Sequence, residues 1–286
     1  MPDLALLDTG TAYFLDRLRA AGLDRPSALP GWTGRHVAAH VSANANALGR
    51  LARWARTGEK ALMYASARAR DAEIEELALL PSDELGELVR TTAAELRAVL
   101  GVGTAGQWAA RVRTAQGREV AAAEVVWMRT REVWVHGADL GGRFEDFPDA
   151  LVDGLIEDVV GTWDARGQGP WMTLRATDRP ALWHVAPPLP DAAEATVQEA
   201  KAPEAQDPKA QDPEAERPEA QGPKTQGPKT EASAVEGARA HQGATVGPVA
   251  AVGPPVVVGT AAALAARLTG RGQPPASGAP PIGRLL

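Results

Sequence analysis

The sequence predicts a mainly α-helical fold: a four-helix bundle followed by a small α/β domain that a disordered proline-rich insert interrupts. Three observations support this. Helical spacing of apolar residues dominates residues 1–167, β-like segments appear in 168–189 and 248–286, and prolines recur throughout much of 190–247. We therefore expect a bundle over 1–167, a second domain built from the two flanking segments, and an unstructured insert between them.

Four segments of the first half carry the bundle, and a fifth helix follows it. They are predicted over residues 3–21, from Thr33 to about residue 55, from Ser82 to residue 100, over 118–137 and over 149–164. Thr33 and Ser82 are suitable N-cap residues, and glycines end several of the segments. Residues 108–114 are expected to form a short strand or an extended loop.

The second half has a different pattern. Residues 171–177 and 181–186 alternate as two strands around a turn, and residues 255–270 read as a strand that runs into a helix. Between them, prolines recur every five residues from Pro203 to Pro228 among charged and small residues. Because proline blocks helices and sheet ladders, and the apolar content is low, we expect residues 190–247 to be a disordered spacer.

Composition narrows the functional classes. The chain has 286 residues, a net charge of −6 and no cysteine. A nucleic-acid partner is not expected from this charge, and any thiol chemistry requires a thiol from outside the protein. The N-terminus does not resemble a signal peptide, and no apolar run is long enough for a membrane span. We expect a cytoplasmic enzyme or binding protein, monomeric or homodimeric, that acts on a small molecule.

Two short helical motifs carry the candidate chemistry. Glu132 and His136 are four residues apart and share a helix face, and His36 and His40 have the same spacing in an upstream helix. Two histidines and a carboxylate suit a catalytic divalent metal, because three protein ligands leave one coordination position open. The alternative is that these are hydrogen-bonded core residues. His36 is expected in a supporting position or in solvent rather than as a ligand.

The same motifs resemble a known family. The run PGWTGRHVAAHVSANANAL from Pro30, together with REVWVHGADLG from Arg131, is similar to the mycothiol-dependent maleylpyruvate isomerases, within the wider DinB-like metalloenzymes. The resemblance covers residues 1–187 and resumes over about 252–275. It implies a DinB-like bundle in which His40, Glu132 and His136 bind zinc or another divalent metal.

The resemblance also implies roles for three further residues. Asn44 and Asp139 would bind the mycothiol cofactor or orient a metal ligand, with ordinary capping or solvent exposure as the alternative. Arg271 would bind a substrate carboxylate through a bidentate fork, or else serve as a cation at a helix C-terminus.

The implied function is cis–trans isomerisation of an unsaturated diacid by reversible addition of the thiolate of mycothiol. Two alternatives remain open at this stage. One is a mycothiol S-transferase or conjugate hydrolase on the same scaffold, and the other is a non-catalytic DinB-like protein that binds a metal or ligand.

Overall fold

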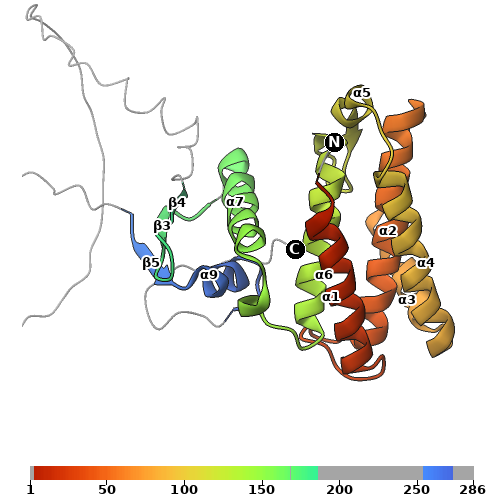
Figure 1. The fold of residues 1–286 in the computed structure, drawn as a ribbon, viewed down its shortest axis with the longest axis horizontal. Coiled ribbons are helices and arrows are strands. Elements are labelled where there is room, and N and C mark those ends of the chain that lie inside the picture. The colour runs from red at the N-terminus through yellow and green to blue at the C-terminus, as the bar shows by residue number, and fades with distance from the viewer. Residues whose placement is uncertain (1–2, 168, 186–253, 273–286) are drawn as a thin grey trace, which may run out of the picture. The chain divides into compact units, whose positions relative to one another are not determined.

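The computed structural model describes residues 3–167, 169–185 and 254–272, which all belong to one of the chain's two compact units. Four helices form the predicted bundle: α1 (Ala5–Ala21), α2 (Gly34–Thr57), α4 (Ser82–Leu100) and α6 (Glu124–Asp139). Figure 1 shows them side by side, with α2 packed against α4 and α6, and α1 against α6. The mainly helical fold class is confirmed.

Helix α2 is the centre of the bundle because it is buried around most of its circumference. Its interior is rich in alanine, and small side chains let neighbouring helices approach closely on several sides. The predicted N-cap, Thr33, is confirmed, and the left-handed Gly58 ends the helix. This position brings residues of α2 close to α6, where the second motif lies.

Two short α-helices and one 3₁₀ helix, η1 (Phe144–Asp146), lie outside the predicted set. Helix α3 (Ala67–Ala78) packs on α2, and α5 (Ala105–Ala109) follows α4. Ser66 caps α3 by accepting a hydrogen bond from the amide of Ala69, and Thr104 caps α5 in the same way. The predicted cap at Ser82 is wrong, because Ser82 is already helical and its hydroxyl accepts a hydrogen bond from Arg35.

The predicted start of the fourth bundle helix at residue 118 is also wrong. Residues Arg111–Arg113 (β1) and Glu119–Ala121 (β2) pair as an antiparallel hairpin, with Gly117 at positive φ in its turn. Pairing with β1 takes up residues 119–121, so α6 begins only at Glu124. The expectation of a strand within residues 108–114 is confirmed.

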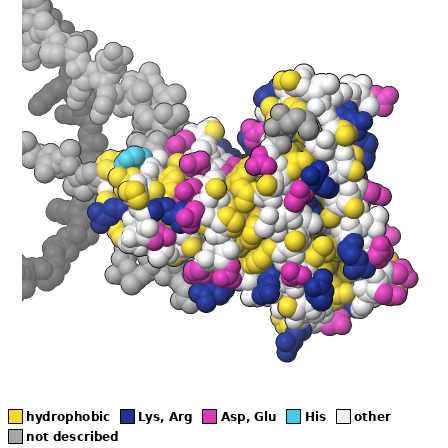
Figure 2. Space-filling model, viewed as in Figure 1, with side chains coloured by type: hydrophobic (Ala, Val, Ile, Leu, Met, Phe, Trp, Pro, Cys, Tyr) yellow, Lys and Arg dark blue, Asp and Glu magenta, His cyan; other side chains and the backbone are white. Residues whose placement is uncertain are grey.

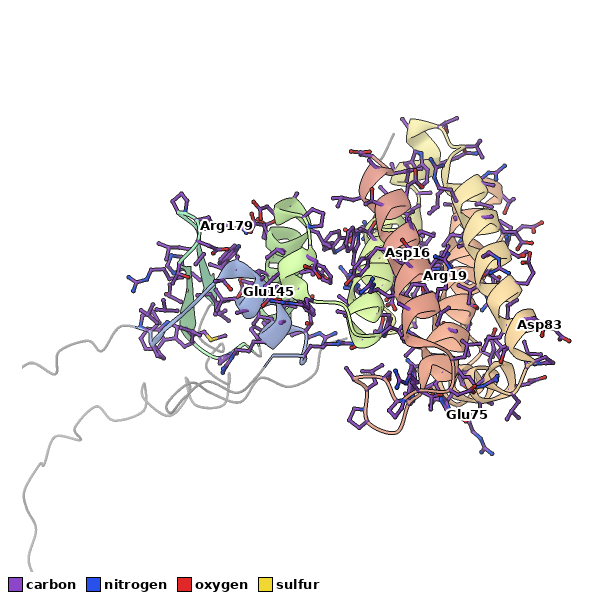
Figure 3. All side chains as sticks on the ribbon, turned by 60° about the horizontal axis from the view of Figure 1, so that its bottom comes forward. Asp16, Arg19, Glu75, Asp83, Glu145 and Arg179 are labelled. Carbon is purple, nitrogen blue, oxygen red and sulfur yellow. The ribbon has the colours of Figure 1, made fainter. Side chains whose placement is uncertain are left out.

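The elements from residue 149 onward form the small α/β part. Helix α7 (Asp149–Arg166) precedes β3 (Met172–Ala176) and β4 (Leu182–Val185), and β5 (Val256–Gly259) leads into α9 (Ala261–Leu268). The central strand β3 is antiparallel to β4 and parallel to β5. Arg179, in the β3–β4 turn, ties this sheet to α7 through ion pairs with Asp149 and Asp153 (Figure 3).

Two further expectations concern the proline-rich insert and a membrane span. The predicted insert at 190–247 lies outside the described residues. None of the helices in the described ranges is long and apolar enough to cross a membrane. On the face shown in Figure 2, basic and acidic side chains are interspersed rather than gathered by sign.

Candidate metal site

Three of the predicted site residues converge at the α2–α6 contact. The Nε2 atoms of His40 and His136 each lie 3.2 Å from Oε2 of Glu132, and the two imidazole rings are 4.8 Å apart. The ligand atoms of all three side chains lie within 4.8 Å of one another, so the cluster has the composition and spacing of a metal site. The pairing of two helices expected from the sequence brings these residues together.

His36 lies one turn before His40 and has a different task. Its Nδ1 accepts a hydrogen bond of 3.2 Å from the backbone amide of Thr33, and its Nε2 lies 3.7 Å from Glu75. This contact satisfies an amide at the helix N-terminus, in the manner of a capping box. His36 therefore supports the start of α2 and stands outside the three-residue cluster.

Asp139 and Arg271 form a second layer behind His136. The Nδ1 atom of His136 lies 2.8 Å from Oδ2 of Asp139, which fixes the imidazole orientation. Arg271 donates to both carboxylate oxygens of Asp139, at 3.0 and 2.9 Å, and to the carbonyl of Thr269. The carboxylate of Asp139 is fully buried, so the guanidinium is its counter-charge. Arg271 still lines the cavity in front of the cluster.

Asn44 lies one turn after His40 on α2 and is not among the residues that line the cavity. It is buried, and its Oδ1 accepts a hydrogen bond of 3.0 Å from Nη1 of Arg129, which also donates to the carbonyl of Val41 at 2.7 Å. Arg129 is itself buried, and burial lowers its pKa to about 10. The arginine thus fastens α6 to α2 one residue beyond His40. Sequence reasoning missed this contact, because an arginine in a helix is usually exposed.

The charges of the cluster depend on one another. Burial alone would raise the pKa of Glu132, but hydrogen bonds with His136 and His40 outweigh it and hold that pKa well below its ordinary value. Burial lowers the pKa of His40. Burial also opposes charge on His136, yet hydrogen bonds with Asp139 and Glu132 raise its pKa. The carboxylate is therefore charged at neutral pH, and the site attracts a cation.

A cavity of about 410 Å³ opens onto the cluster. Its walls combine apolar residues of the loop before α2 with three arginines. Besides the three cluster residues, the lining consists of Leu29, Pro30, Trp32, Arg70, Gln116, Arg131, Val135 and Arg271. Each of the three arginines also pairs with a carboxylate outside the cavity wall: Arg271 with Asp139, Arg131 with Asp158 and Arg70 with Asp71. Their remaining N–H groups are donors suited to an anionic ligand. Sequence reasoning missed both Arg70 and Arg131 as cavity residues. Arg70 stands in no recognisable motif, and Arg131 begins the REVWVHGADLG run but was given no role there.

Comparison with known proteins agrees with this geometry. The model of the mycothiol maleylpyruvate isomerase N-terminal domain matches residues 4–141. Two crystal structures of the mycothiol-dependent maleylpyruvate isomerase, one of a histidine-to-alanine mutant, are each 36% identical to this chain with a TM-score of 0.61. Each match covers 65% of this chain and 80% of the other. Comparison with curated proteins gives no match.

Proposed function

Because the chain belongs to the mycothiol-dependent maleylpyruvate isomerase family, we propose that it is a zinc enzyme that uses mycothiol to isomerise an unsaturated diacid such as maleylpyruvate. One observation carries this proposal. His40, Glu132 and His136 converge at a cavity that Arg271 also lines. A set of side chains suited to a metal ion and a guanidinium suited to a carboxylate thus face the same space.

The donor set fits zinc. Zinc ligands at about 2.0–2.2 Å in a tetrahedral arrangement lie roughly 3.3–3.6 Å apart, close to the 3.2 Å between each Nε2 and Oε2 of Glu132. When the Nδ1–H group of a neutral His136 donates its hydrogen bond to Oδ2 of Asp139, the lone pair on Nε2 points toward Glu132. Two facing lone pairs repel unless a cation or proton lies between them. Bound zinc would supply an open position for the thiol sulfur and lower the pKa of the thiol.

The thiol would supply a nucleophile that adds reversibly across the cis double bond, so that rotation and elimination of the same sulfur give the trans product without net change in atoms or electrons. The protein's own side chains position the reactants. Asp139 keeps the His136 ring in one orientation, and Arg271, held rigidly by Asp139, presents its remaining N–H groups to a substrate carboxylate. Leu29, Pro30 and Trp32 add an apolar side to the same cavity.

Zinc content tests the metal half of the proposal. The purified protein should hold about one zinc per chain, and His40→Ala should lose it. His184→Ala is the matched control, because His184 lies in β4 and contacts Thr173 instead of the cluster. A wild-type protein that binds no divalent metal would overturn the metalloenzyme proposal.

Isomerase assays test the other half. The zinc-loaded protein should convert maleylpyruvate only when mycothiol is present, and Arg271→Ala should raise KM for the diacid while zinc remains bound. A protein that binds zinc and mycothiol but transfers the sulfur to another acceptor would support the S-transferase alternative. Zinc binding without turnover under any thiol would favour the non-catalytic binding protein.

A further inference from the structure

A second cavity adjoins the metal site. Its volume is about 760 Å³, and its walls come from the β1–β2 turn, α6 and α7. Gln116 and Arg131 line both this cavity and the one in front of the cluster. Arg131 directly precedes the ligand Glu132 and is ion-paired with Asp158 of α7. The two spaces therefore meet at a side chain that the fold holds in place.

The lining of the second cavity is rich in hydrogen-bonding groups of both kinds. Glu124 and Glu157 offer acceptors, and Arg118 and Arg166 offer donors. Within the described ranges, none of these four side chains takes part in a hydrogen bond or ion pair, whereas most arginines of the bundle do. In addition, Nε of Arg131 is buried without a hydrogen-bond partner. Unused donors and acceptors around one space suit a ligand with many hydroxyl groups.

We propose that this second cavity binds the sugar portion of mycothiol, while the adjoining cavity receives its sulfur and the diacid. The inference rests on the proposed function and adds the residues that would recognise the cofactor. Mycothiol is a cysteine derivative joined to glucosamine and inositol, so most of the molecule is a chain of hydroxyl groups. The cavity in front of the cluster has a volume of about 410 Å³, and if it also accepts the substrate it leaves little room for the sugars. The second cavity is larger and shares Gln116 and Arg131 with it.

Carboxylates are the sharpest probes of this subsite. A carboxylate accepts hydrogen bonds from two neighbouring hydroxyls, and charge-assisted bonds of this kind are stronger than neutral ones. Glu124 lies at the start of α6 and Glu157 in α7, so the two approach the cavity from different helices. Neither forms a hydrogen bond or ion pair with His40, Glu132 or His136. Their replacement should therefore leave metal binding intact.

The test compares two thiols on the zinc-loaded protein by isothermal titration calorimetry. Mycothiol carries the sugars, and N-acetylcysteine is a matched thiol without them. Glu124→Ala and Glu157→Ala should each weaken mycothiol binding about tenfold, which corresponds to roughly 1.4 kcal/mol, and leave N-acetylcysteine binding unchanged. Glu95→Ala, an exposed glutamate on α4, should alter neither thiol.

Each outcome separates this inference from the proposed function. If wild-type protein binds both thiols at its zinc with equal affinity, or if the two variants weaken both thiols equally, the sugar subsite is refuted while metal–thiol binding stands. If the zinc protein binds neither thiol, the proposed function and the subsite fall together. Zinc analysis of every variant, made before the titrations, shows that the metal site is intact.

Discussion

Asp139 is the residue whose replacement most directly tests the second layer of the site. Its carboxylate accepts from Arg271 at both oxygens and also holds Nδ1 of His136. In Asp139→Asn the shape is nearly unchanged, but the amide has only one acceptor oxygen. Whichever way the amide turns, its NH₂ group faces an N–H donor of Arg271 or His136. The substitution therefore removes the charge and introduces a donor–donor contact.

The expected cost follows from burial. The Asp139 side chain is fully buried and that of Arg271 is 10% exposed, so solvent screens the pair only slightly. Removing one partner of such a pair costs about 3–5 kcal/mol of unfolding free energy. Because asparagine keeps one acceptor oxygen, we expect Asp139→Asn to cost about 3 kcal/mol. Loss of the contact that orients a ligand histidine should weaken zinc binding by about 10- to 100-fold.

Urea unfolding of the chelator-treated protein and zinc competition with a chromogenic chelator measure the two effects separately. Asp16→Asn is the control, because Asp16 and Arg19 form an exposed ion pair on α1 (Figure 3). That change should cost less than about 1 kcal/mol and leave zinc affinity unaltered. If Asp139→Asn behaves like the control in both measurements, our account of the second layer is refuted.

Three other perturbations follow from the packing around the site. Gly137→Ala should destabilise the protein by about 1–3 kcal/mol, because a Cβ there would lie 2.4 Å from the ring of Tyr13. Gly86→Ala, the control in an open helical position, should instead stabilise the protein by roughly 0.5–1 kcal/mol in the same urea experiment. Arg129→Met should lower both unfolding free energy and zinc affinity, since it frees α6 from α2 beside His40; unchanged zinc affinity would contradict the clamp. Burial, followed by the negative charges of Glu132 and Glu73, raises the pKa of Tyr64 to about 12. At pH 10 the Tyr64 phenol should therefore stay protonated in the folded protein and ionise only on unfolding. Because the folded state binds this proton more tightly than the unfolded state does, the stability that Tyr64 contributes is lost as pH rises above about 10. Near-ultraviolet absorbance of the phenolate, with Tyr64→Phe as reference, measures the ionisation of Tyr64.

The bundle and the cluster of His40, Glu132 and His136 were predictable because each depends on a strong local pattern. Helical periodicity located α1, α2 and α4, and four-residue spacing put Glu132 and His136 on one face. The four-helix arrangement then needed only one pairing, α2 against α6, to bring His40 opposite them.

Features that depend on tertiary contacts were not predictable in the same way. Only Ile74 and Ala78 of α3 are buried, so the helix has too few apolar positions for a clear period. The start of α6 is set by the pairing of β1 with β2, which its own sequence does not reveal. The contact of Asn44 with Arg129 joins residues 85 positions apart, and no motif announces it.

The pairing of Asp139 with Arg271 also has a consequence for biosynthesis. The two residues are 132 positions apart, so the ribosome adds the arginine roughly 7–26 seconds after the aspartate at ordinary elongation rates. His40, Glu132 and His136 are all synthesised before that interval begins. The three residues of the proposed metal site are therefore all synthesised before the counter-charge of Asp139. The proposed metal site and the proposed substrate anchor are in this way completed at different times during translation.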